Sequence, residues 1–192
     1  MNIVHFPHPA LRWKSQPITT INSRLRSTVA EMFELLYESK GVGLAANQVV
    51  LPWRVFVINS TGDSEDKDQE FVFINPEITG RKGSEEAEEG CLSLPELYGD
   101  VRRPSEIVVE AWDLKGQEFQ MGLSELPARV VQHENDHLDG VLFVDRLSDS
   151  ARREIQPRLD DFRVVFQRQQ DDGQIPAEQD LNRRLNELES QA

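Results

Sequence analysis

The chain has 192 residues, enough for one domain with a buried core, and its 38% hydrophobic and 29% charged content argues against wholesale disorder. Acidic side chains outnumber basic ones by 34 to 21, and residues 61–100 alone carry twelve acidic and three basic groups. This balance argues against direct nucleic-acid binding, because phosphate contacts require clustered Lys and Arg. The single cysteine, Cys91, excludes an internal disulfide and fits a reducing compartment.

The N-terminal stretch, MNIVHFPHPALRWKSQPI, does not resemble a targeting sequence. It has prolines and a tryptophan where a signal peptide needs an uninterrupted apolar segment, and it lacks the Arg- and Ser-rich helix of a transit peptide. No run approaches the roughly 18 apolar residues of a membrane span. We therefore expect a cytoplasmic protein that does not associate with a membrane.

The first half of the chain predicts one helix followed by two strands. Residues 22–39 place apolar side chains at helical spacing, with Asn22 or Ser23 as the cap, and the glycines of GVG at 41–43 end this helix. Residues 54–60 and 70–78 are rich in β-branched and aromatic side chains and predict strands. The acidic segment between them predicts a solvated loop, and the acidic run EEAEE at 85–89 is also expected to be mostly solvated.

The second half predicts a hairpin and a long helix. Residues 106–114 and 117–123 are two strands that turn at Lys115-Gly116, and SELPARVVQHENDHLDG at 124–140 has the start and stop signals of a helix. Strands thus precede and follow one long helix without regular βαβ alternation. This order predicts an α+β fold, with antiparallel or mixed sheets around a central helix.

The pattern weakens after Leu147. Residues 148–166 predict a helix interrupted at Pro157, residues 167–179 a polar linker, and the remainder a short helix with an apolar stripe of Leu181, Leu185 and Leu188. We therefore divide the chain into a catalytic domain at residues 1–166 and a polar linker with a short C-terminal helix at 167–192.

The long helix carries the strongest chemical signal, the sequence HENDH. His133 and His137 are four residues apart, so one helix face presents both imidazoles to a single ion. Glu134 follows the first histidine and would reach the open side of that ion, where a base acts on water. The alternative to a metal site is that both histidines are ordinary polar residues on a solvated helix face.

The third ligand decides which kind of site this is. A histidine ten residues after the first would suit one class of metallopeptidase, but that position is Phe143. Glu154 is the nearest downstream glutamate and would serve a zinc peptidase. Cys91, in EEGCLSLPELYG, would complete a set of one thiolate and two imidazoles with one open position, the pattern of a catalytic site.

Three separate stretches resemble the peptide deformylases: GVGLAANQ at 41–48, EGCLS at 89–93 and QHENDHLDG at 132–140. The flanking FPHPALRWKSQPI and VLFVDRL are similar too, so the resemblance covers about residues 3–147. It implies a peptide-deformylase-like α+β domain that removes the N-formyl group from the initiator methionine of new polypeptides. It also implies one divalent metal ion held by Cys91, His133 and His137.

The resemblance assigns further roles. Glu134 would take a proton from water and later deliver it to the leaving amine. The side-chain amide of Gln48 and the backbone N–H of Leu92 would stabilise the oxyanion. The carboxylates of Glu89 and Asp136, with Arg103, are candidates for fixing the orientation of the metal ligands.

A pocket for the methionine side chain is expected beside the metal. Leu126 and Val130 share the helix face of His133, and Val42 lies on the facing Gly-rich segment. Plain core packing would also account for Leu126 and Val130. Gly43 would let the backbone approach an extended substrate closely.

The resemblance implies Fe²⁺ as the native ion in many members, with Zn²⁺, Ni²⁺ or Co²⁺ after purification. The expected partners are N-formyl-Met nascent peptides. Some members dock on the ribosome through a basic C-terminal helix, but residues 151–192 here hold seven arginines, no lysines and nine acids. Two alternatives stay open: a zinc peptidase that uses Glu154, and an inactive binding protein on the same scaffold.

Overall fold

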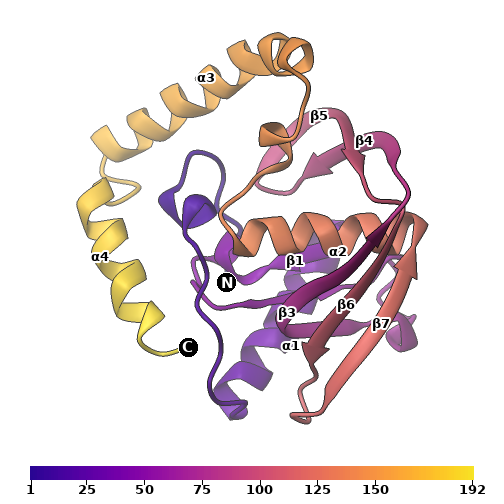
Figure 1. The fold of residues 1–192 in the computed structure, drawn as a ribbon. Coiled ribbons are helices and arrows are strands. Elements are labelled where there is room, and N and C mark those ends of the chain that lie inside the picture. Colours follow the sequence, from indigo (N-terminus) through magenta and orange to yellow (C-terminus); the bar gives the residue numbers. More distant parts are fainter.

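The computed structural model describes residues 1–192 and has two antiparallel sheets around a central helix (Figure 1). A five-stranded sheet has the order β1-β2-β3-β6-β7, and β4 and β5 form a separate two-stranded hairpin. The helix α2 lies between the hairpin and the larger sheet. The α+β prediction is confirmed, and every pairing between the strands is antiparallel. The bounds are β1 Gly43–Ala45, β2 Val55–Ile58, β3 Phe71–Lys82, β4 Glu85–Cys91, β5 Leu94–Arg103, β6 Glu106–Trp112, β7 Glu118–Ser124, α1 Ser23–Glu38, α2 Glu125–Leu138, α3 Asp149–Asp171 and α4 Glu178–Glu189.

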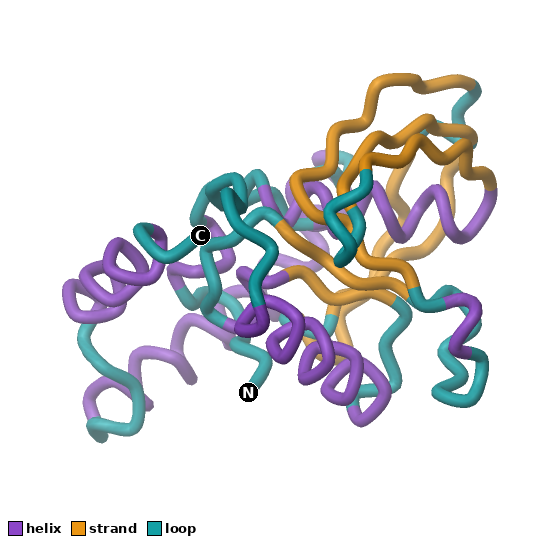
Figure 2. Tube along the Cα trace, turned by 90° about the horizontal axis from the view of Figure 1, so that it is seen from below, coloured by secondary structure: helices purple, strands orange, loops and turns teal.

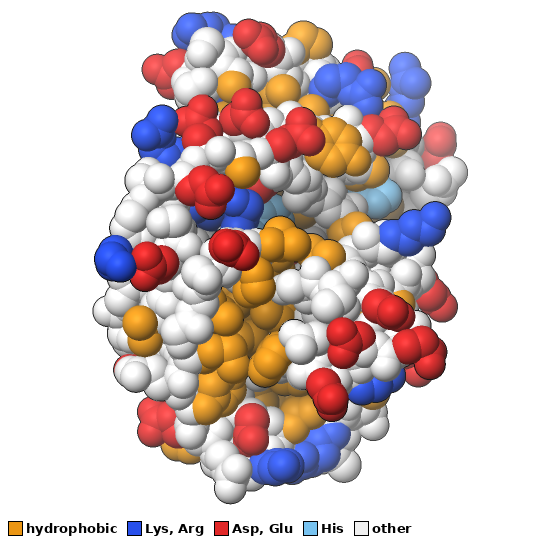
Figure 3. Space-filling model, turned by 90° about the vertical axis from the view of Figure 1, so that its right-hand side faces the viewer, with side chains coloured by type: hydrophobic (Ala, Val, Ile, Leu, Met, Phe, Trp, Pro, Cys, Tyr) orange, Lys and Arg blue, Asp and Glu red, His pale blue; other side chains and the backbone are white.

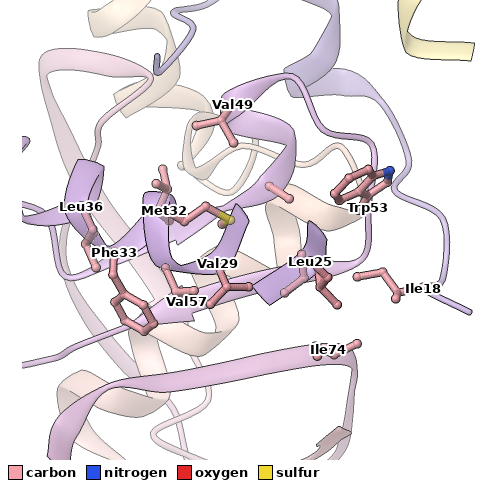
Figure 4. Close-up of a cluster of buried hydrophobic side chains, with 13 residues drawn as sticks. Ile18, Leu25, Val29, Met32, Phe33, Leu36, Val49, Trp53, Val57 and Ile74 are labelled. Carbon is pink, nitrogen blue, oxygen red and sulfur yellow. The ribbon is translucent and has the colours of Figure 1, made fainter. Parts of the chain in front are cut away.

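Strand β2 shows why helices cover both faces of the larger sheet. All four of its residues are buried, and successive side chains point to opposite faces. Val55 and Val57 join the apolar cluster that α1 contributes to (Figure 4), whereas Phe56 and Ile58 join the cluster under α2. The larger sheet therefore packs against one side of α2, and the hairpin lies on the other side of this helix.

The boundaries predicted for the helices at 22–39 and 124–140 and for the hairpin agree with the structure to within two residues. The side chain of Asn22 accepts a hydrogen bond from the backbone N–H of Leu25 at 3.0 Å and so caps α1. Residues 106–112 and 118–124 pair in register around Gly116, as the turn signal predicts. The segment after the first helix differs, because residues 43–45 form the buried strand β1.

The acidic run at 85–89 is mostly solvated, as expected, but the strand that it belongs to was not predicted. It forms β4, which pairs with β5 from Glu85↔Arg103 onward. Glu85, Glu86 and Glu88 are exposed, but Glu89 is buried. The sequence pattern does not indicate this strand, because its buried positions include a charged residue and the apolar alternation typical of a strand is missing.

The C-terminal region also differs from its prediction. Helix α3 continues through Pro157 to Asp171, so residue 166 lies inside a helix, and the connection to α4 spans residues 172–177. Pro157 is tolerated because it lies on an exposed face, where the carbonyl left without a backbone donor faces water. The division of the chain into two domains stays a prediction.

Helix α4 folds back onto the body of the protein, on the side away from β6 and β7 (Figures 1 and 2). Leu181 and Leu185 are buried, and the indole N–H of Trp53 donates to the backbone carbonyl of Leu188 at 3.0 Å. The apolar stripe of the last helix therefore packs within the chain. None of the helices is long and apolar enough to cross a membrane.

Candidate metal centre

Two elements bring one sulfur and two imidazoles together. The last residue of β4 is Cys91, and its Sγ lies 3.2 Å from Nε2 of His137 on α2. One potential ligand atom from each of Cys91, His133 and His137 lies within 4.8 Å of the others. Glu154 is outside this group, on an exposed position of α3. The structure therefore contains a Cys-His-His group of the kind that binds a divalent ion.

The surroundings of this group favour a positive charge. Burial opposes protonation of His133, but the neighbouring Cys91 and Glu89 outweigh it and raise the pKa of this imidazole to about 10. Burial lowers the pKa of His137 well below its usual value, and the charge of His133 adds to this. A single cation between the sulfur of Cys91 and the carboxylate of Glu89 is therefore stabilised. Cys91, His133 and His137 thus fit a metal ion both in charge and in ligand type.

Glu134 lies beside the group without a hydrogen-bond partner for one of its oxygens. Its side chain is buried and Oε2 has no donor nearby. Burial raises the pKa of this carboxyl to about 7, although the charges of His133 and Arg103 lower it. A carboxyl that titrates near neutral pH suits a group that accepts and returns a proton.

Gly43 explains how Glu134 can approach β1. A Cβ atom at this position would lie 2.5 Å from Oε1 of Glu134 and 2.8 Å from Cγ1 of Val130. A side chain here would displace Glu134 and Val130 from β1, so the glycine serves close packing rather than an unusual backbone angle.

The side chain of Gln48 is fixed with its amide directed at the sulfur. Its Oε1 accepts from the backbone N–H of Ala45 at 2.8 Å, so the NH₂ group must point the other way. This group donates to Oγ of Ser93 at 3.2 Å and lies 3.6 Å from Sγ of Cys91. Leu92 occupies the turn between Cys91 and Leu94.

Glu89 holds one imidazole in place. Its Oε1 and Oε2 accept from Nε and Nη2 of Arg103 at 2.6 and 2.8 Å, and Oε2 lies 3.1 Å from Nδ1 of His133. Burial alone would raise the pKa of Glu89, but Arg103 and His133 lower it to about 2. A carboxylate at Nδ1 leaves Nε2 of the same ring free to bind a metal.

Asp136 extends this arrangement on the far side of Arg103. Nη1 of Arg103 donates to Oδ2 of Asp136 at 2.7 Å, and Arg146 donates to both oxygens of the same carboxylate. The side chains of Arg103 and Asp136 are 3% and 10% exposed, so their ion pair is buried, whereas the side chain of Arg146 is 43% exposed and reaches Asp136 from the surface.

A cavity of about 530 Å³ opens beside the Cys-His-His group. Val42, Gly43, Leu126 and Val130 line it together with Cys91 and His133. Val130 is 6% exposed whereas Leu126 is 50% exposed, so core packing does not account for Leu126. Figure 3 shows a hollow on this side of the molecule with a histidine inside it and a band of hydrophobic side chains below, bordered by acidic groups.

A larger cavity of about 930 Å³ lies elsewhere, between the N-terminal segment and α3 and α4. It contains His5 and His8 but none of the residues of the Cys-His-His group. We therefore place the reaction in the smaller cavity, where a base and potential metal ligands meet.

The structure adds three residues that the sequence did not single out. Ser93 accepts from Gln48, and the side-chain amide of Asn47 donates to the backbone carbonyl of His137. Arg129 donates to Glu89 at 2.7 Å. Ser93 and Asn47 lie within the stretches EGCLS and GVGLAANQ, which was a usable signal, but Arg129 resembles any other charge on the polar face of a helix.

Comparison with known proteins gives one consistent family. The family model of polypeptide deformylase matches residues 1–153. A peptide deformylase of Rhodopirellula baltica is 45% identical over 190 residues, covering 99% of this chain and 94% of that protein. A peptide deformylase of Nitrosococcus oceani is 43% identical over 160 residues, covering 83% of this chain and 94% of that protein.

Solved structures of the same kind share the fold. A peptide deformylase of Plasmodium falciparum superposes with a TM-score of 0.84 at 35% identity, covering 86% of this chain and 97% of that one. Peptide deformylase 1B of Arabidopsis thaliana also gives a TM-score of 0.84, at 36% identity, with 92% and 94% covered.

Proposed function

This chain belongs to the polypeptide deformylase family and is a metal-dependent hydrolase that removes the N-formyl group of new polypeptides; we propose that Cys91, His133 and His137 hold its metal ion. The observation that carries this assignment is the meeting of three ligand atoms within 4.8 Å of one another beside the buried carboxyl of Glu134. A divalent ion held there would act as a Lewis acid and bring the pKa of a bound water down to about 7.

Glu134 is the proposed acid and base. Its carboxylate takes one proton from the water that attacks the formyl carbon. The same group then gives that proton to the amine nitrogen as the C–N bond breaks, and formate and a free amino terminus leave. The burial of this carboxyl and the missing donor at Oε2 support the role, because a side chain that no donor fixes is free to take up and release a proton.

Gln48 and Leu92 are the proposed donors to the oxyanion. The NH₂ group of Gln48 is held in the site by the backbone N–H of Ala45, which occupies the oxygen of the same amide. The backbone N–H of Leu92 follows the ligand cysteine directly. Donors that are fixed before the reaction stabilise the developing charge most effectively, typically by about 3 kcal/mol each.

The cavity beside the ligands is the proposed methionine pocket. Val42, Leu126 and Val130 supply an apolar wall, and Gly43 lets a substrate backbone lie close to β1. An unbranched, flexible side chain such as methionine can follow the shape of a narrow apolar recess. The half-exposed Leu126 forms the rim.

Glu89, Arg103 and Asp136 are proposed to orient the ligands rather than to touch substrate. Glu89 does so directly at Nδ1 of His133, and Arg103 keeps Glu89 ionised. Asp136 acts one step further away by pairing with Arg103.

We propose Fe²⁺ as the native ion, on the strength of the family resemblance. The ligand types alone suit Zn²⁺, and the usual order of affinities places Ni²⁺ and Zn²⁺ above Fe²⁺. Purified protein is therefore expected to carry Zn²⁺, Ni²⁺ or Co²⁺ unless it is prepared anaerobically with Fe²⁺.

We propose a cytoplasmic enzyme whose partners are N-formyl-Met nascent peptides. Ribosome docking by the C-terminal tail is not part of this proposal. The tail has more acids than arginines, and the apolar side chains of α4 are buried against the body.

The test is anaerobic release of formate from formyl-Met-Ala, with metal analysis of the same sample. Wild-type protein should release formate with about one ion per chain, and Cys91→Ala should lose both the ion and the activity. A zinc peptidase that used Glu154 would keep its ion and its peptidase activity after this substitution. An inactive binding protein would release no formate from any sample reconstituted with Fe²⁺ or Ni²⁺.

A further inference from the structure

Arg129 and His133 reach the same carboxylate from neighbouring turns of α2. They are four residues apart, so they share one face of the helix. Nη1 of Arg129 donates to Oε1 of Glu89 at 2.7 Å, and Nδ1 of His133 lies 3.1 Å from Oε2 of the same group. The carboxylate of Glu89 thus connects His133 to Arg129, which lies one helical turn earlier.

The same guanidinium also contacts the backbone of both strands of the hairpin. Nη1 donates to the carbonyl of Val101 on β5 at 2.9 Å, and Nη2 donates to the carbonyl of Glu85 on β4 at 3.2 Å. The side chain of Arg129 is 11% exposed, so water competes little for its bonds to Glu89 and Val101, whereas the Glu85 carbonyl lies at an exposed position. A single residue of α2 therefore fixes the beginning of β4, the end of β4 and the facing part of β5.

The hairpin needs such an attachment because it has no other strand to pair with. β4 and β5 form a sheet of two strands that is separate from the larger one, and a two-stranded hairpin is marginally stable alone. It carries Cys91, two residues after Glu89, whereas both histidines are on α2. The distance from the sulfur to the imidazoles therefore depends on how firmly β4 is held against α2.

We propose that Arg129 is a positioning residue of the metal site. By holding Glu89 and the hairpin backbone against α2, it keeps Cys91 within bonding reach of an ion that His133 and His137 also bind. This inference rests on the proposed ligand set. Arg129 also lines the substrate cavity, so the effect of its charge has to be separated from the effect of its bulk.

Arg129→Met separates the effect of the charge from the effect of the bulk, because methionine retains an unbranched apolar stem but has no donors. The matched control is Arg102→Met on the same hairpin, where the side chain is 70% exposed and pairs with Glu86 at the surface. Arg129→Lys keeps the charge but has all its donors on one nitrogen, which cannot span Glu89 and both carbonyls as two guanidinium nitrogens do.

The measurement is the rate at which Ni²⁺-loaded protein loses its ion to excess chelator, without substrate. Arg129→Met should lose the ion about 10- to 100-fold faster than wild type, Arg129→Lys should fall between them, and Arg102→Met should match wild type. The unfolding temperature of the chelator-treated proteins is measured in parallel. Rates within twofold of wild type for both Arg129 variants would overturn the proposal, whatever their unfolding temperatures, because a merely structural residue changes the latter alone.

Cys91→Ala, run beside them, distinguishes the two levels of inference. If this variant holds Ni²⁺ as tightly as wild type, the ligand set is wrong. If it does not, and the Arg129 variants release Ni²⁺ at the wild-type rate, the ligand set stands and the positioning role fails.

Discussion

Replacing Glu89 by Gln should change how the stability of the protein depends on pH. Glu89 is a buried carboxylate with donors from Arg103, Arg129 and His133, and its pKa is lowered from 4.5 to about 2. A depressed pKa means that the carboxylate adds stability above the pKa of the unfolded chain. That contribution is lost as the pH falls from about 4.5 towards 2.

The size of the effect follows from the shift. About 2.5 pH units at about 1.36 kcal/mol each correspond to roughly 3 kcal/mol at neutral pH. About 1 kcal/mol of this is lost at pH 4 and about 2 kcal/mol at pH 3. His133 adds no slope in this range, because a raised pKa contributes stability that is fully present below 6.5 and is lost only as the pH rises towards about 10.

The assay is urea unfolding of wild type and Glu89→Gln between pH 6 and pH 3, with chelator present in both. The variant should be less stable by about 3 kcal/mol at pH 6, and the gap should shrink to about 1 kcal/mol at pH 3. Glu86→Gln, on an exposed position of the same strand, should shift stability by less than about 1 kcal/mol at every pH. A gap between wild type and Glu89→Gln that stays constant over this range would refute the argument that an ionised Glu89 stabilises the fold.

Three further predictions concern the base, the pocket and the tail. Glu134→Gln should keep the metal ion but release formate about 10²- to 10⁴-fold more slowly, because an amide cannot accept the proton; undiminished turnover would exclude the proton-transfer role. Val130→Trp should raise KM for formyl-Met-Ala more than Leu126→Trp does, because Val130 is 6% and Leu126 50% exposed; equal KM values in steady-state kinetics would contradict this pocket. Leu185→Ala should cost about 2–5 kcal/mol in the docking of α4, detected as faster hydrogen exchange around Trp53, while formate release is retained; unchanged exchange would contradict a buried anchor at this position.

Local signals were sufficient for α1, for α2 and for the spacing of the two histidines. The cap at Asn22, the apolar spacing of α1 and the i, i+4 histidines depend on residues within a few positions of each other. The structure confirms that α2 begins after Ser124 and that both histidines share one side of it. Such features are encoded by a contiguous segment, so a single sequence reveals them.

Non-local pairing explains what the sequence did not reveal. Glu89 and Arg103 were candidates by residue type, but the bonds of Glu89 to Arg103 and Arg129 do not follow from the local sequence, because these partners are 14 and 40 residues away. An acidic run in a solvated loop and an acidic strand with one inward carboxylate have the same composition. The same reasoning applies to Arg129, whose partners all belong to a different element.

The two buried carboxyls of the site show how one fold assigns different chemistry to the same side chain. Glu89 and Glu134 flank the same imidazole, yet the pKa of one is lowered to about 2 and that of the other is raised to about 7. Two arginines and a ring nitrogen donate to Glu89, whereas Oε2 of Glu134 has no donor at all. Donors stabilise the ionised form, and burial without them stabilises the protonated form. A carboxylate that stays ionised can orient an imidazole but cannot return a proton, and this difference supports the proposal that Glu134, rather than Glu89, exchanges protons with the substrate.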